Sequence, residues 1–434
     1  MKKMGIFVSL LLIGAFAYAG PAPEGSSVLE VNEPVKLVAT FWGGAAKIGA
    51  FEKSVAAYQE KYPNVTIELL NIPGGDYNGK ILSMIAANTP PDVININSTL
   101  SVELEGQLVD LTGKMTELGY FDTKNGLWPE WFNLLATDGF YNKGEALFTA
   151  PLGTGSDVLA YNKQMFVEAG VEFPNENWTW EEDFLEAAKK LTRDGQFGVT
   201  GVPFRNSAVL YPMAKANGGA VYDYDALKFT GNSQPVIDAY QFAQDLIYKH
   251  KVHPTPAEEE ALGGANGGVF RNQKAAMYFM PTWQFPPYYG ADFEWDIMQL
   301  PSGREGSWSS IYGGRLSVLK SSPNIAHGIE FIDLINGPIG QGYFSVESGF
   351  NNPPLKSIAY GDAFMKGPKG APEHNEYRVT VLEKAVIVYP VLPNGSKIGS
   401  AWGNKLDLFW QNEIDAAQMM RELEREVQPL LDDR

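Results

Sequence analysis

Short β-rich runs alternate with helical segments along this chain, and this alternation limits the possible folds more than any other feature of the sequence. Lys36–Phe41 and Val65–Ile72 predict strands, and the segment between them carries apolar residues every three to four positions, which is typical of an amphipathic helix. A helix over Lys80–Asn88 and a short buried strand over Val93–Ile96 are expected next. Such alternation indicates α/β domains with parallel sheets and right-handed crossovers.

The alternation continues through the middle of the chain. The length of 434 residues, at ~150 residues per domain, predicts two or three domains. Further helices are expected over Trp180–Leu191, Ile237–Tyr248, Ala326–Ile335 and Ala416–Val427. The further expected strands are Val158–Tyr161, Gly198–Pro203, Ala275–Phe279 and Leu316–Leu319.

Residues 1–19 have the pattern of a secretory signal peptide. Lys2 and Lys3 precede an apolar run over Ile6–Phe16, and Ala17–Ala19 is a small-x-small cleavage pattern. The apolar run is shorter than the ~20 residues that a membrane-spanning helix needs. No cysteine follows it, so a lipid anchor on a new N-terminal cysteine is not expected. The protein is therefore expected in the periplasm or outside the cell.

Composition excludes several classes of function. The absence of cysteine excludes disulfide scaffolds, thiolate zinc sites, iron–sulfur clusters and cysteine nucleophiles. Asp and Glu number 51 against 34 Lys and Arg, a formal net charge of −17. Nucleic acids and anionic membranes require a positively charged surface, so neither is expected as the main partner.

Motifs for catalysis and metal binding are incomplete. Gly74–Lys80 matches the GxxxxGK pattern of a phosphate-binding loop, but Ile81 stands where Mg²⁺ binding needs a hydroxyl. His250 and His253 lie at an expected helix C-terminus, where imidazoles interact favourably with the helix dipole. The GxSxG motif of serine hydrolases does not occur. We therefore expect no catalytic residue, no metal site and no cofactor.

Aromatic and polar residues follow several of the expected strands. Ligands of open α/β sheets bind at the carboxyl ends of strands, which makes 42–47 and 97–99 candidate ligand loops. Trp42, Trp283 and Trp402 stand beside small or amide residues. The C–H face of a sugar ring stacks on an indole, and its hydroxyls need amide, carboxylate or guanidinium partners. These tryptophans are therefore candidate sugar contacts.

Several motifs together resemble those of one protein family. Asp157–Asp194 contains a strand, Tyr-Asn-Lys, a short helix ending in Gly, a Pro, a Trp and a helix ending in Lys-Leu-Thr. The other matches are Tyr62–Val65, Pro90–Val93, Gln273–Met277 with Trp283, and Gly313–Gly314 before a strand. In order and spacing they resemble the extracellular solute-binding proteins of family 1, the sugar-binding subunits of ABC importers. The resemblance runs from about Val35 to about Val427.

The resemblance implies a two-lobe periplasmic-binding-protein fold of type II, in the α/β class. Its ligand would lie in the cleft between the lobes, which close on it about a hinge of three chain crossings. The crossings are expected at 149–153, 280–283 and 320–322. These place residues 28–152 and 283–320 in the N-terminal lobe and residues 153–282 and 321–434 in the C-terminal lobe.

The resemblance also implies which residues contact the ligand. Ile96 stands where maltose binders of the family carry an aromatic residue, and Gly155 where they carry an acid, which argues against maltose. The positions that match ligand contacts are Trp42, Gly43, Lys47, Asn97, Ser98, Ser156, Arg205, Asn206, Trp283, Gln284, Gly314, Arg315 and Trp402.

The expected function is that of a monomeric carbohydrate-binding receptor, not an enzyme. It would capture an oligosaccharide and deliver it to the membrane permease subunits of an ABC importer. One alternative keeps the fold but makes the ligand a uronate-containing oligosaccharide or another anionic solute, such as a glycerol phosphate ester, because Arg205 and Arg315 suit a carboxylate. The other is a secreted carbohydrate-active enzyme, since acidic pairs with the spacing of glycosidases can form on folding.

Overall fold

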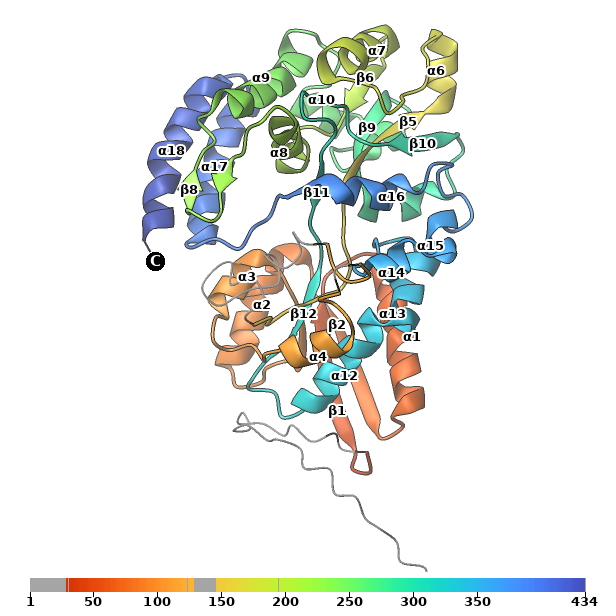
Figure 1. Ribbon diagram of the computed structural model, residues 1–434, viewed down its shortest axis with the longest axis vertical. Helices are drawn as coiled ribbons and strands as arrows, with labels where there is room; N and C mark the ends of the chain where they lie inside the picture. Colours follow the sequence, from red (N-terminus) through yellow and green to blue (C-terminus); the bar gives the residue numbers. More distant parts are fainter. Residues whose placement is uncertain (1–28, 30, 123, 129–145, 194, 434) are drawn as a thin grey trace, which may run out of the picture.

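The computed structural model describes residues 29, 31–122, 124–128, 146–193 and 195–433. The expected signal peptide, residues 1–19, lies outside these ranges. The described chain forms two α/β lobes that follow one another along the longest axis of the molecule (Figure 1). The two-lobe α/β architecture expected from the sequence is confirmed.

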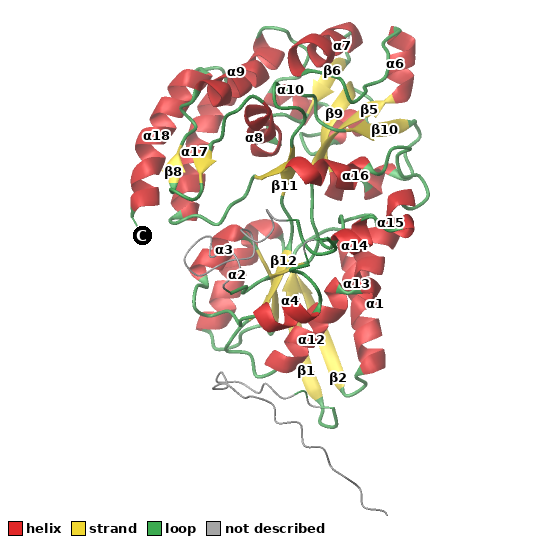
Figure 2. Cartoon of the chain, viewed as in Figure 1, coloured by secondary structure: helices red, strands yellow, loops and turns green. Residues whose placement is uncertain are grey.

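A five-stranded sheet with the order β2–β1–β3–β12–β4 organises the first lobe. The first three strands are parallel, whereas β12 runs antiparallel to both β3 and β4. Helices cover both faces of this sheet (Figure 2). The strands are β1 Val35–Phe41, β2 Val65–Asn71, β3 Val93–Ile96, β4 Ala150–Pro151 and β12 Arg315–Val318. The helices of this lobe are α1 Ala45–Lys61, α2 Gly74–Ala86, α3 Ser98–Glu103, α4 Thr112–Glu117, α12 Ile325–Asn336, α13 Pro338–Gln341, α14 Lys356–Ala359 and α15 Asp362–Lys366.

A four-stranded sheet with the order β10–β5–β9–β6 organises the second lobe. Strand β5 is antiparallel to both neighbours, and β6 is parallel to β9. Two small sheets, β7–β8 and β11–β13, lie beside it. The strands are β5 Asp157–Asn162, β6 Phe197–Thr200, β7 Tyr222–Asp223, β8 Lys228–Phe229, β9 Ala275–Pro281, β10 Trp295–Met298, β11 Ser309–Ile311 and β13 Ala385–Ile387. The helices are α6 Lys163–Ala169, α7 Leu185–Leu191, α8 Asn206–Ala216, α9 Gln234–Tyr248, α10 Pro256–Ala261, α11 Gly268–Arg271, α16 Tyr377–Thr380, α17 Gly395–Trp410 and α18 Ala416–Asp432.

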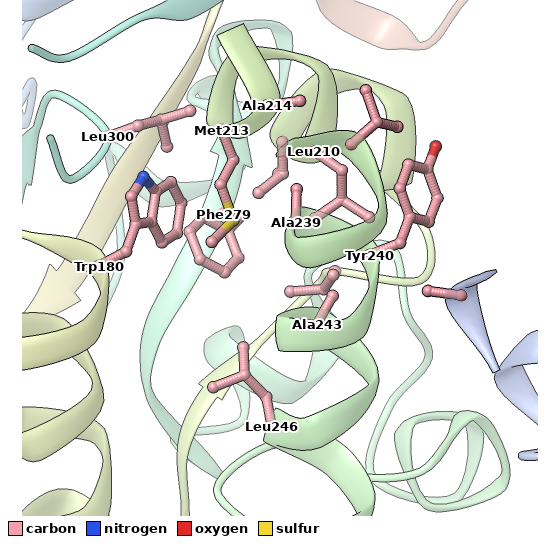
Figure 3. Packing of buried hydrophobic residues seen from close by; sticks show 14 of the residues in the cluster. Trp180, Leu210, Met213, Ala214, Ala239, Tyr240, Ala243, Leu246, Phe279 and Leu300 are labelled. Carbon is pink, nitrogen blue, oxygen red and sulfur yellow. The ribbon is translucent and has the colours of Figure 1, made fainter. Parts of the chain in front are cut away.

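Each lobe has its own hydrophobic core. In the second lobe, Trp180, Met213 and Phe279 pack beside helix α9 (Figure 3). Helix α9 presents Ala239 and Ala243 at this contact, and these short side chains leave room for the large ones opposite. Burial of such apolar surface, at about 25 cal/mol per Å², is the main stabilising contribution to folding.

The structure corrects the expected lobe boundaries. Strand β10 pairs with β5 in the second sheet, although the family resemblance predicts residues 283–320 in the first lobe. Helix α12 buries Phe331 and Ile332 in the core of the first lobe, although residues 321–434 were assigned to the second. An apolar run shows that a segment is buried but not which sheet it joins, because pairing partners lie far apart in sequence.

The glycine-rich motif before Ile81 is helical. Gly74–Lys80 forms the first turns of α2, so it is not the loop that a phosphate-binding motif requires. Within the described ranges, no helix combines the length and the apolarity that a membrane crossing needs.

Candidate functional site

A cavity of about 770 Å³ lies between the two lobes. This volume is within the ~300–1,000 Å³ that small-molecule sites usually occupy. The first lobe contributes the loops after β1 and β3 and the start of β12, and the second lobe contributes α8, β7 and α17. The remaining wall comes from connecting segments, at 152–155, 312–314, 350–351 and 388–392, and from Trp283.

Parallel strands position the first-lobe wall. Strands β1 and β3 are neighbours and run in the same direction, so the loops that follow them meet at one edge of the sheet. Those loops carry Trp42, Gly43 and Asn97 into the lining. A Cβ atom on Gly43 would lie 2.7 Å from Cδ of Lys47, so a glycine is needed where the lysine side chain passes.

Two buried cations belong to this wall. Lys47 Nζ donates to Asn95 Oδ1 at 2.5 Å, and Asn95 Nδ2 donates to the carbonyl oxygen of Arg315 at 2.7 Å. Arg315 donates to Ser98 Oγ at 3.2 Å. Burial lowers the pKa of Lys47 to about 7 and that of Arg315 to about 10. The Lys47 ammonium also lies 4.8 Å from the centre of the Trp42 ring.

Aromatic side chains from both lobes face the cavity. Trp42 is held by an edge contact with Tyr77, whose ring centroid is 4.7 Å away. Trp402 is fixed by its Nε1, which donates to Tyr222 Oη at 2.7 Å. These side chains are rigid surfaces on which a planar or ring-shaped ligand could stack. The described aromatic residues in the lining are Trp42, Tyr211, Tyr222, Trp283, Tyr312, Phe350, Tyr389 and Trp402.

Most of the ligand contacts expected from the sequence lie in this lining. Asn97 has a structural role as well, because its Oδ1 accepts from the Leu100 amide and caps α3. Trp402 is largely a core residue, packed near Tyr211 and Tyr240, and only part of it faces the cavity. The expected residues in the lining are Trp42, Gly43, Lys47, Asn97, Ser98, Asn206, Trp283, Gly314, Arg315 and Trp402.

Arg205 is not in the lining, contrary to expectation. Its Nε and one terminal nitrogen each donate to a carboxylate oxygen of Asp157 at 2.8 Å, and both side chains are buried. Ser310 Oγ completes the site by donating to the same carboxylate. The guanidinium is thus held by an acid 48 positions away, which no local pattern indicates.

Ser156 and Gln284 also lie outside the lining. Ser156 Oγ donates to the carbonyl oxygen of Arg378, and the side chain is fully buried. Gln284 accepts from Tyr278 Oη at 2.8 Å and donates to Asn266. Both side chains therefore fix the chain close to the cavity rather than facing it.

Sequence reasoning missed five aromatic residues of the lining, and none stands in a loop that directly follows a strand of the main sheets: Tyr211, Tyr222, Tyr312, Phe350 and Tyr389. Tyr222 lies in the short strand β7. Tyr211 lies within helix α8, and Phe350 lies in the connection after α13. Tyr312 stands directly before Gly313–Gly314, which matches the family pattern near the expected ligand contacts. This position in the sequence is the signal by which Tyr312 could have been predicted. Tyr389 lies in the segment that leads from β13 to α17 and exposes 45% of its surface.

A second group of titratable residues lies away from the cavity. Ligand atoms of Asp296, Glu373 and His374 all lie within 4.8 Å of one another. His374 Nδ1 is 2.7 Å from Asp296 Oδ2, and Lys163 Nζ donates to Glu373 at 2.7 Å. The Lys163 ammonium thus already provides positive charge beside these carboxylates.

The two-lobe fold with a cavity between the lobes defines a binding-protein architecture. Residues 44–342 match the family model of the bacterial extracellular solute-binding proteins. The chain belongs to this family.

Relatives and solved structures agree with this assignment. The chain is 26% identical over 287 residues to an arabinooligosaccharide-binding protein of Halalkalibacterium halodurans, covering 62% of this chain and 60% of that protein. It thus aligns with less than two thirds of that relative's length. An ABC substrate-binding protein from Listeria monocytogenes in complex with cycloalternan has a TM-score of 0.80 at 21% identity, covering 92% of this chain and all of that one. Maltose-bound MalE3 of T. maritima has a TM-score of 0.76 at 20% identity over the same share of this chain.

Proposed function

We propose that the protein is a carbohydrate receptor that captures an oligosaccharide in the cavity between its lobes. The observation that carries this proposal is the lining itself, in which aromatic rings from both lobes alternate with amide, hydroxyl and cationic groups. Sugar rings present C–H faces to aromatic rings and hydroxyls to polar groups, so a saccharide matches both kinds of surface.

The arrangement of the walls supports hinge closure as part of this proposal. A ligand that contacts both lobes binds the closed form better than the open one, and it shifts the equilibrium by that difference in affinity. Ser98 of the first lobe donates to the carbonyl oxygen of Tyr389, which lies in the segment leading to α17 of the second lobe. This hydrogen bond joins the two sides at the cavity edge.

Names of similar proteins support a saccharide ligand. They bind, by those names, arabinooligosaccharides, cycloalternan and maltose. We extend this to the present chain as part of the proposal, together with delivery of the sugar to the permease subunits of an ABC importer from the outer side of the membrane.

A binding role is favoured over glycoside hydrolysis. Hydrolysis needs two carboxyl groups that flank the glycosidic bond. The described residues of the lining include no Asp or Glu. The polar groups that they offer are those of Lys47, Arg315, amides and hydroxyls, which can hold a sugar without cleaving it.

Titration calorimetry against a panel of trisaccharides tests the proposal. The panel comprises α-1,4-galactotriose, cellotriose, maltotriose, xylotriose and arabinotriose, each accompanied by its uronate form where one exists. We expect one chemical class to bind and to be recovered intact after several hours, as judged by mass spectrometry. Cleavage of the bound sugar would make the protein an enzyme, and a panel without any binder would contradict a saccharide receptor.

A further inference from the structure

The charge of the cavity is opposite to that of the protein. The chain has a formal net charge of −17, with 51 acidic residues. The described lining nevertheless contains Lys47 and Arg315 and not one of those acids. A lining drawn at random from this sequence would carry more acids than bases, so the reversal calls for an explanation in terms of the ligand.

Both cations are buried in a fixed arrangement. Lys47 is 3% exposed and Arg315 2% exposed. Asn95 connects them, since it accepts from the Lys47 ammonium and donates to the Arg315 carbonyl. Withdrawal of a cation from water is unfavourable unless an anion compensates it. Among the described residues, no carboxylate lies within ion-pairing distance of Lys47; its neighbours are Asn95 and the rings of Trp42 and Phe350.

We propose that the oligosaccharide carries a carboxylate, as a uronate sugar does, and that this group lies against the first-lobe wall beside Lys47 and Arg315. This inference rests on the proposed receptor function and specifies the ligand class of the same cavity. The aromatic residues hold the sugar rings, and the two cations compensate the acid. Arg205 has no part in this, because its guanidinium is bound by Asp157.

The local charges act against the field of the whole protein. At physiological ionic strength the repulsion from distant acids is screened beyond about 8 Å, whereas buried charges in contact with the ligand are screened little. A carboxylate inside the cavity therefore experiences mainly Lys47 and Arg315. Hydrogen bonds from Lys47 and Arg315 to this carboxylate would be charge-assisted, and charge-assisted hydrogen bonds are roughly twice as strong as those between neutral groups.

Proton uptake is expected to accompany binding. Burial lowers the pKa of Lys47 to about 7, so most of the population is neutral at pH 8 in the absence of ligand. The titratable and charged groups that face it through Asn95 are Arg315 of β12 and Tyr77 of α2, whose hydroxyl accepts from the backbone N–H of Asn95. A bound carboxylate favours the ammonium form, raises its pKa, and makes affinity fall as the pH rises from 7 to 9.

The experiment compares acidic and neutral forms of one sugar. For the hexose trisaccharide that binds best in the panel, in either its neutral or its uronate form, both forms are titrated calorimetrically at pH 6.5 and 8.5. Binding confined to xylotriose or arabinotriose, which have no C6 to carry a carboxylate, would overturn the acidic ligand. We expect the uronate form to bind at least tenfold tighter at pH 6.5, to lose part of this advantage at pH 8.5, and to take up protons, as shown by different enthalpies in two buffers.

Substitutions test whether Lys47 and Arg315 cause the preference for the uronate form. Lys47→Met and Arg315→Gln should each reduce the preference for the uronate form at least fivefold. The matched controls, Lys53→Met on the exposed side of the same helix and Arg421→Gln on α18, should leave the preference unchanged. Thermal unfolding of each variant shows whether it is folded, and binding of the neutral sugar gives a second check.

The outcomes separate the two proposals. Tighter binding of the neutral form, or a uronate preference that survives both substitutions, would overturn the acidic ligand and leave the saccharide receptor intact. Failure of every neutral and acidic sugar in the panel would overturn both.

Discussion

Tyr389 and Tyr360 are matched residues in different surroundings. They expose 45% and 42% of their surfaces, but only Tyr389 lies in the cavity lining. Tyr389→Ala should weaken saccharide binding at least tenfold, or about 1.4 kcal/mol, because an aromatic stacking surface is lost. Tyr360→Ala should leave the affinity unchanged. Calorimetry of both variants checks this, and equal affinities would mean that Tyr389 does not contact the sugar.

The Asp157–Arg205 pair should contribute to stability rather than to binding. Arg205→Met leaves the Asp157 carboxylate buried without its cation, and loss of one partner of a buried ion pair costs about 3–5 kcal/mol. Urea unfolding should show this loss, and the double variant Asp157→Leu/Arg205→Met should recover part of it. Affinity for the sugar should change less than threefold in the folded variants; a larger change would give Arg205 a role in the site.

These residues mark what local sequence can predict about the site. Trp42 and Lys47 could be found, because Trp42 directly follows strand β1 and Lys47 lies in the first turn of the helix after it, at the edge of the sheet that borders the cavity. Arg205 occupies a similar position but belongs to a pair with Asp157, and nothing near either residue indicates that contact. Tyr211 lines the cavity from within helix α8. From the sequence, an aromatic residue within a helix is usually interpreted as part of the hydrophobic core.

At the scale of elements, the sequence predicts many of the helices and strands but neither α8 nor α17, and it predicts pairing partners poorly. Strands β1, β2 and β3 lie within one or two residues of their expected ranges, because alternation and turn residues are local signals. Strand β10 and helix α12 were placed in the wrong lobes, since their partners, β5 and the first-lobe core, are distant in sequence. Their correct placement requires long-range pairing information.

The connecting segments that line the cavity are held together at Gly155. Its amide donates to the Tyr312 carbonyl at 2.7 Å, and a Cβ atom here would lie 2.3 Å from the Tyr312 ring. Gly155→Ala should therefore displace this buried ring, lower the free energy of unfolding by about 1–3 kcal/mol and weaken sugar binding. Gly290→Ala is the control, since no atom lies within 4 Å of its added Cβ. If the two substitutions changed the affinity equally, the position of the Tyr312 ring would not matter for sugar binding.

At the scale of the whole molecule, ligand binding should both compact and stabilise the protein. A sugar that bridges the walls favours the closed form, and a ligand at 100 times its Kd adds about 2.7 kcal/mol to the free energy of unfolding. Small-angle X-ray scattering should show a smaller radius of gyration at saturation, and thermal unfolding a higher Tm. A saturated complex whose radius of gyration equals that of the free protein would contradict hinge closure.

The opposite signs of the overall and local charge give the last prediction, which rests on the acidic ligand. At low salt the field of a protein with a net charge of −17 extends about 30 Å at 0.01 M and repels an approaching uronate. At 0.15 M it extends about 8 Å, so the association rate constant should rise with added salt. The dissociation rate constant should change less, because Lys47 and Arg315 are buried where salt screens them little. Stopped-flow measurements of intrinsic tryptophan fluorescence at several salt concentrations check both rates, with the neutral trisaccharide as the control that should show no trend. An association rate constant for the uronate that falls with salt would mean that a positive surface outside the cavity steers the ligand.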